Sequence, residues 1–277
     1  MKRANKRVIP GFGISMGVTI SILSIIVLIP LASLVLFTAQ MDIGEIFATI
    51  TRKRVLASFE VSFLTALIAS AINAVAGVVL AWVLVRYDFP LKRLLDGMIE
   101  LPFALPTAVA GIALTSLTVD TGLIGRFFAN LGVKIAYTRV GITVALVFIG
   151  IPFVVRAVQP VLEKLDASYE EAALVLGASR SRIFWKVIFP EIRPAIFTGF
   201  GLAFGRCLGE YGSVVFIAGN QPFETEITPL IIMSELQEYD YASATAIALV
   251  MLLASFLILF LVNLVQMRNN KILKGGN

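Results

Sequence analysis

Two short stretches of this sequence carry the side chains whose types and spacing could do chemistry. In the first, residues 171–177 read E-A-A-L-V-L-G and residues 187–190 read V-I-F-P. In the second, Arg206 and Glu210 interrupt an apolar run. The first stretch offers a compact, partly charged and glycine-hinged surface, which is what a soluble partner needs in order to move an apolar protein. The second places a cation and an anion inside an apolar segment.

Arg206 and Glu210 are four residues apart, so on a helix they share one face. A lone charge near the middle of a membrane helix costs about 2.5–3.5 kcal/mol on insertion scales, which favours mutual pairing. Two interpretations stay open at this point. The pair locks a helix bundle together, or its face lines a hydrated path on which a paired arginine attracts a passing anion only weakly.

The sequence lacks the groups of the common catalytic and metal sites. It has no histidine and one cysteine, Cys207. A Ser/His/Asp set, a disulfide and a cysteine-based metal site are therefore excluded, and we expect no metal and no catalytic residue. No G-x-x-x-x-G-K-[ST] phosphate loop occurs, so we expect no cofactor on this chain and no ATP hydrolysis by it. Energy for any uphill transport must come from another polypeptide.

Composition predicts an all-α integral membrane protein. Of 277 residues, 58% are hydrophobic and 15% are charged, and the mean hydropathy is +0.91. A membrane-spanning helix takes roughly 20 apolar residues. Six segments meet that requirement, with the third bent by its prolines: 14–39, 59–84, 98–119, 140–159, 195–219 and 243–266.

The positions of Lys and Arg predict the orientation. They concentrate in segments that face the cytoplasm if the chain begins inside, so both termini, the tails 1–13 and 267–277, are expected there. Basic triplets at 52–54 and within 126–139 fall on the outside and weaken this signal. The net charge of +5 then serves to orient a protein that is surrounded by membrane lipid. No nucleic acid is expected as a partner.

The loop at 160–194 is the one sizeable hydrophilic element on the inner side. Asp166 or Ser168 can cap a short helix there. Gly177 can end that helix in the left-handed conformation. Ser179 or Ser181 can begin a second helix, and Pro190 with Pro194 is expected to break the chain before the fifth span.

This loop resembles the cytoplasmic E-A-A signature of binding-protein-dependent ABC importer permeases, with Val187 and Phe189 in place of the usual I-x-L-P residues. The resemblance implies a type I ABC importer-like permease bundle with a cytoplasmic coupling-helix loop, in a bacterial cytoplasmic membrane. The first helix at 14–39 would precede a core permease domain at 55–266. Two ABC ATPase subunits, holding ATP-Mg, would dock on the loop. The residues implied for this ATPase coupling are Glu171, Ala172, Ala173, Gly177 and Pro190.

Residues 209–227 carry a second resemblance, which concerns the cargo. G-E-Y-G at 209–212, then G-N and P-F-x-T-E-I at 219–227, is similar to oxyanion permeases and most of all to those of the sulfate/thiosulfate type. The resemblance implies an extracytoplasmic sulfate-binding protein and a second permease, either CysW-like or a homodimer mate. A molybdate or tungstate permease is the alternative within the class. A passive anion channel or a membrane scaffold is the alternative outside it.

Some polar and small residues in the predicted spans are candidates for the translocation path. Packing is the competing interpretation for each, above all for the glycine stripe at 201, 205, 209 and 212, whose spacing is typical of close helix contact. The pathway candidates are Arg206, Gly209, Glu210, Tyr211, Gly212 and Thr107.

Overall fold

The structure is a computed structural model that describes residues 12–274, and every regular element in that range is helical. Two of the elements, η1 and η2, are single π-helical turns. In chain order the elements are α1 (Phe12–Leu23), η1 (Ser24–Leu28), α2 (Ile29–Thr38), α3 (Ile43–Ile50), α4 (Lys53–Arg86), α5 (Lys92–Ala104), α6 (Thr107–Thr118), α7 (Leu123–Ala129), α8 (Arg139–Lys164), α9 (Ala167–Val175), α10 (Arg180–Ile183), η2 (Phe184–Ile188), α11 (Phe189–Leu208), α12 (Val214–Ile217), α13 (Thr228–Gln237) and α14 (Tyr241–Lys274).

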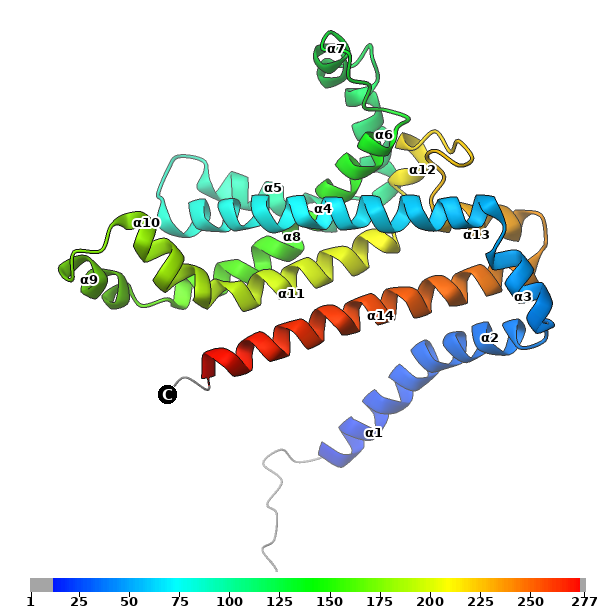
Figure 1. Ribbon diagram of the computed structural model, residues 1–277, viewed down its shortest axis with the longest axis horizontal. Helices are drawn as coiled ribbons and strands as arrows, with labels where there is room; N and C mark the ends of the chain where they lie inside the picture. Colours follow the sequence, from blue (N-terminus) through cyan, green and yellow to red (C-terminus); the bar gives the residue numbers. More distant parts are fainter. Residues whose placement is uncertain (1–11, 275–277) are drawn as a thin grey trace, which may run out of the picture.

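Helices α4, α8 and α11 form the centre of the bundle (Figure 1). They approach closely because small residues lie where they cross. A Cβ on Gly77 of α4 would come within 2.7 Å of the Val154 side chain on α8, and a Cβ on Gly199 of α11 would come equally close to the Val154 Cα. Missing side chains at these crossings let backbones pack as membrane helices commonly do.

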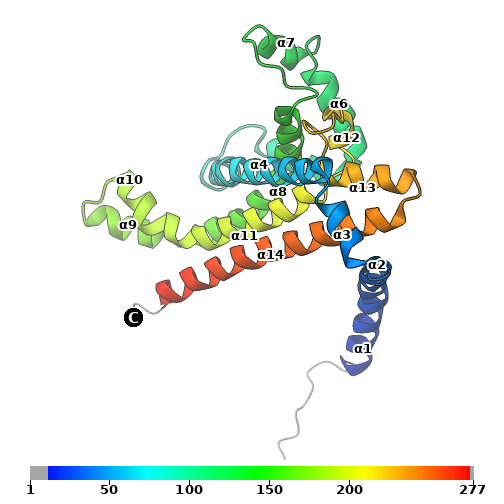
Figure 2. The same ribbon diagram turned by 45° about the vertical axis from the view of Figure 1, so that its right-hand side comes forward.

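The spans agree with the expected number. Within residues 12–274, five helical runs are long and apolar enough to cross a membrane, and the pair α5 and α6 makes a sixth if its two halves count as one span. That pair is bent by 116°. Leu105 is extended, as the residue before a proline tends to be, and Pro106 then begins a new helix. Helices α6 and α7 project sideways from the bundle in both views (Figures 1 and 2).

The fifth span differs from the expected 195–219. Its helical run begins at Arg180 and ends at Leu208, so residues 209–213 form a loop and Arg206 lies in the last turn, not near the middle. We expected Pro190 and Pro194 to break the chain before the fifth span. That prediction was wrong, because the helical run continues through both prolines. The π turn η2 absorbs Pro190, because Phe189 N–H bonds to the carbonyl of Phe184 five residues earlier.

The N-terminal run Phe12–Thr38 lies apart from the centre, with α2 packed against α14. It carries a second π turn, η1, next to Pro30. At the other end of the chain α14 stays helical as far as Lys274, well into the stretch expected to be a tail. Residues 1–11 of the expected tail 1–13, and residues 275–277, lie outside the described residues.

Candidate functional site

The E-A-A signature lies on α9, at the end of the bundle opposite α3 and α13 (Figure 1). Asp166 caps α9 by accepting the Ser168 backbone N–H at 2.9 Å, and this bond holds the pKa of Asp166 below its ordinary value. Gly177 has a φ of +78°, the left-handed conformation expected for it. Its N–H bonds to the Leu174 carbonyl, and Ala178 N–H bonds to the Ala173 carbonyl, which completes a Schellman cap.

The residues expected to meet an ATPase differ in their exposure. Glu171, Ala172 and Gly177 are exposed, whereas Ala173 is half-buried against the bundle and Pro190 is half-buried in α11. The most prominent apolar side chains on the loop are two residues that the motif does not include. Val175 is 88% exposed and Leu176 is 86% exposed. Their position could have been noticed in the sequence, because large apolar residues between the E-A-A and the glycine are unusual in a hydrophilic loop.

Two contacts attach this loop to the C-terminal end of α4, and sequence reasoning missed both. Arg86 in the last turn of α4 forms an ion pair with Glu170 of α9. Trp82, one turn earlier, meets the ring of Phe184 edge-on, with centroids 5.6 Å apart. The partners are too far apart in the chain for spacing to reveal them.

Arg206 and Glu210 form the pair that their spacing predicts. Arg206 Nη1 lies 2.6 Å from Glu210 Oε2, and Glu210 is only 2% exposed. The other carboxylate oxygen accepts the backbone N–H of Ser213 at 2.8 Å and its hydroxyl at 3.0 Å. The side chain of Arg206 is 35% exposed. A buried carboxylate therefore holds an arginine that still reaches the surface of this chain.

The loop after α11 interlocks with the start of α6. A Cβ on Gly212 would come within 2.1 Å of Thr107 Oγ1, and a Cβ on Gly111 would come within 2.5 Å of the Ser213 carbonyl oxygen. Tyr211 is 36% exposed beside this contact. The candidates Thr107, Glu210, Tyr211 and Gly212 are thus brought together around one loop, with Arg206 at its edge.

The glycine stripe does not pack as its spacing suggested. A Cβ on Gly201 or Gly205 would find no atom nearer than 3.5 Å, and one on Gly209 would find none nearer than 4.0 Å. Gly201 and Gly205 instead line an open apolar groove between α11 and α14. Gly209 and Gly212 lie beyond the helix end, so only Gly212 makes the close contact that was expected of all four.

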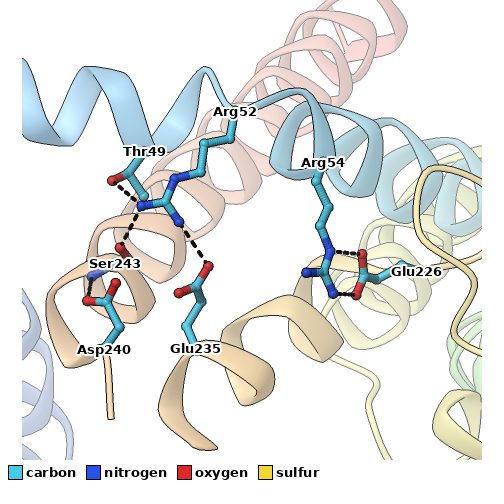
Figure 3. A network of polar contacts seen from close by, with 7 residues as sticks. All are labelled: Thr49, Arg52, Arg54, Glu226, Glu235, Asp240 and Ser243. Carbon is cyan, nitrogen blue, oxygen red and sulfur yellow. Dashed lines mark hydrogen bonds and ion pairs between the residues drawn. The ribbon is translucent and has the colours of Figure 1, made fainter. Parts of the chain in front are cut away.

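Ion pairs join the N-terminal end of α4 to α13 and the segment before it, and a hydrogen bond from Arg52 to Ser243 reaches the N-terminal end of α14 (Figure 3). Arg54 donates two hydrogen bonds to the buried carboxylate of Glu226, from Nε at 2.7 Å and from Nη2 at 2.6 Å. Arg52 Nη1 lies 3.1 Å from Glu235 Oε1. Desolvation raises the pKa of Glu235, while hydrogen bonding to Ser243 lowers that of Asp240. Arg52 and Arg54, two of the basic residues that weakened the orientation signal, are therefore paired with acidic neighbours.

A further charged group lies between α5 and α8. Arg156 Nη1 is 2.8 Å from Asp96 Oδ1, and its Nη2 is 2.7 Å from Glu100 Oε1. Gln159 accepts a third bond at 2.7 Å. Arg156 falls within the predicted span 140–159, and sequence reasoning gave it no partner. Its apolar neighbours on α8 were the signal that a charge at this position needs one.

Comparison with known proteins gives the context of these features. Residues 73–271 match the family described as binding-protein-dependent transport system inner membrane component. The chain is 49% identical over 265 residues to the sulfate transport system permease protein CysT of Salmonella typhimurium, covering 96% of each chain. It is 50% identical over 244 residues to the CysT protein of Synechococcus elongatus, covering 88% of each.

Among solved structures, the chain is similar to a bacterial alginate ABC transporter in complex with an alginate pentasaccharide-bound periplasmic protein. The TM-score is 0.76 at 17% identity, and the match covers 92% of this chain and 93% of that one. At that identity the likeness shows the fold alone. The family match covers most of the chain and the curated relatives cover nearly all of it, so the chain belongs to the family of binding-protein-dependent ABC transport inner membrane components.

Proposed function

We propose that this chain is a membrane-spanning permease subunit of an ATP-driven importer that carries sulfate, and thiosulfate with it, into the cytoplasm. The observation that carries the proposal is the 49% identity to a sulfate transport system permease over 96% of both chains. The exposed α9 loop and the Arg206–Glu210 pair support it, because they supply a surface for a motor and a weak attraction for an anion.

The α9 loop is the surface proposed for two ATPase subunits, which hold ATP-Mg. Glu171, Ala172 and Gly177 offer a small and partly charged face, and Val175 with Leu176 offers apolar side chains for a groove. Ala173 and Pro190 are half-buried, and their proposed role is to pack the loop against the bundle. An ATPase that contacts the loop differently when open and closed shifts the equilibrium between outward-facing and inward-facing bundles, whereas equal contact would shift nothing.

The loop at 209–213 is proposed to border the translocation path, with Arg206, Tyr211 and Thr107 facing the passing anion. Glu210 neutralises Arg206, which keeps the attraction shallow enough for release. A paired arginine still has donor hydrogens for an oxyanion oxygen, because its guanidinium carries five. A second permease, CysW-like or a further copy of this chain, would complete the path from the other side.

The outer end of the bundle is proposed to receive sulfate from an extracytoplasmic binding protein. The ion pairs Arg54–Glu226 and Arg52–Glu235 hold that end together. Both termini would then lie in the cytoplasm with α9, in keeping with an even number of crossings.

Uptake by the complete complex in lipid vesicles tests the proposal. With ATP inside and the loaded binding protein outside, we expect labelled sulfate to accumulate against its gradient, and excess unlabelled sulfate or thiosulfate to suppress it. Stronger suppression by molybdate than by sulfate would overturn the choice of cargo. Uphill accumulation by vesicles that hold this chain without any ATPase subunit would overturn the importer itself.

A further inference from the structure

The Arg86–Glu170 ion pair joins two helix ends of opposite polarity. Arg86 lies in the last turn of α4, where the helix dipole favours a cation, and Glu170 lies in the first turn of α9, where it favours an anion. Each side chain is 24% exposed, so the pair is partly withdrawn from water. The guanidinium also lies over the Trp82 ring, 5.3 Å from its centre. This arginine is therefore fixed from two sides.

Helix α9 follows α8 in the chain and precedes α11, but its link to α4 is made only by side chains. Glu170 reaches Arg86, and Phe184 of η2 reaches Trp82. Phe184 also contacts the rings of Trp185 and Phe189. Helix α4 packs along α8 and α11 through the centre of the bundle. Any displacement of α9 that Glu170 follows thus acts on one of the three central helices.

The Arg86–Glu170 pair uses one nitrogen where two are available. Arg86 Nη2 contacts Glu170 Oε1, whereas Arg86 Nε is buried and has no acceptor among the described residues. The Arg54–Glu226 pair at the outer end uses both Nε and Nη2 in the two-bond arrangement that arginine and carboxylate prefer. A small rotation of α9 would let Glu170 reach Arg86 Nε also. A second arrangement, in which Glu170 also accepts from Arg86 Nε, would give the pair the two states that a transmitting contact requires.

We propose that Arg86 is a positioning residue through which movement of α9 is transmitted to α4, by exchange between the one-bond and two-bond arrangements with Glu170. The proposal rests on the proposed function, since it assumes an ATPase that moves α9. It concerns coupling and not docking: Glu170 is turned toward the bundle, while the neighbouring Glu171 is exposed.

The variants Arg86→Gln and Glu170→Gln, each in the complete importer in vesicles, test the proposal. Sulfate accumulated per ATP hydrolysed is expected to fall by about threefold to tenfold in each, because mutations along a coupling contact change coupling by this order. The ATPase subunit should still copurify in its normal ratio. The double variant Arg86→Gln with Glu170→Gln should lose no more coupling than either single variant, because two residues that act through one contact are not additive.

Lys92→Gln is the matched control, because Lys92 pairs with Asp88 at 2.9 Å and Asp88 is fully exposed. We expect it to keep the normal ratio of sulfate to ATP. A normal ratio in Arg86→Gln and Glu170→Gln would overturn the proposal, as would loss of ATPase binding or a double variant whose loss is the sum of the two single losses. Failure of the proposed function looks different, because the unmodified complex would then not accumulate sulfate.

Discussion

At the scale of single residues, the loop after α11 depends on Glu210. Its carboxylate neutralises Arg206 with one oxygen and holds the backbone and hydroxyl of Ser213 with the other. A buried carboxylate with these partners is satisfied, whereas one without them would be costly inside a membrane protein. The same side chain therefore keeps an arginine in place and fixes the turn that brings Gly212 to Thr107.

The contact between Gly212 and Thr107 gives the first prediction. Gly212→Ala places a methyl group within 2.1 Å of Thr107 Oγ1, so the loop or α6 must shift. We expect overpacking of about 1–3 kcal/mol, seen as a lower thermal unfolding temperature in detergent, together with reduced sulfate uptake. Gly209→Ala is the control, because its methyl group would meet nothing nearer than 4.0 Å. Equal stability in the two variants would show that the interlock does not hold the loop.

The cap of α9 gives a prediction about pH. The hydrogen bond from Ser168 lowers the folded-state pKa of Asp166, so the cap contributes fully above the ordinary aspartate range and is lost as pH falls through the lower folded value. The protection factor of the Ser168 amide, which is its exchange rate corrected for the intrinsic rate at each pH, should fall over that acidic window. Asp166→Asn keeps an oxygen acceptor and should remove the pH dependence with little fraying. Identical pH profiles for both forms would contradict the prediction.

At the scale of the elements, α9 and α10 form a small capped unit that packs against the bundle. Gly177 permits the sharp turn between them, and Asp166 and Ser179 cap their starts. The rings of Trp82, Phe184 and Phe189 pack this unit against the C-terminal end of α4. In the proposed mechanism, a push on α9 would therefore move α9 and α10 together.

Gly177→Val tests that turn. A β-branched residue in the left-handed conformation costs about 1–2 kcal/mol, so the end of α9 should rearrange. We expect less copurifying ATPase subunit and unchanged insertion of the chain in the membrane. Gly132→Val is the matched control: Gly132 has a φ of +76° with equally open surroundings, but it lies between α7 and α8. If both variants bind the ATPase subunit normally, the geometry of the turn is irrelevant to docking.

Features with a local sequence signal were predictable. Six apolar segments, the capped helix that ends at Gly177 and the Arg206–Glu210 pair each depend on residues that are close in the chain. Contacts between distant residues were not predictable, because spacing carries no information about which helices pack together. Arg86 with Glu170 is the clearest case. Pro190 misled because a π turn can absorb a proline, and nothing in the pattern announces that turn.

At the scale of the whole molecule, the bundle has two differently built ends. One end carries the exposed α9 loop, and the other is closed by the ion pairs of Arg52 and Arg54 with acidic residues around α13 (Figures 1 and 3). Helices α4, α8 and α11 connect the two ends. The 209–213 loop lies nearer the end that carries α13 (Figure 1). This arrangement suits a subunit that receives motion at one end and cargo at the other.

Site-specific crosslinking at Val175 tests the central claim most directly. Cys207 is the sole cysteine of the chain and only 3% exposed, so Val175→Cys introduces one accessible thiol on the α9 loop. In intact cells we expect this thiol to resist a membrane-impermeant maleimide and to crosslink to the ATPase subunit. Phe223→Cys places a thiol at a 55% exposed position in the segment before α13. This thiol should react with the maleimide and should not crosslink to the ATPase subunit. Labelling of Val175→Cys from outside, with no ATPase adduct, would contradict the account.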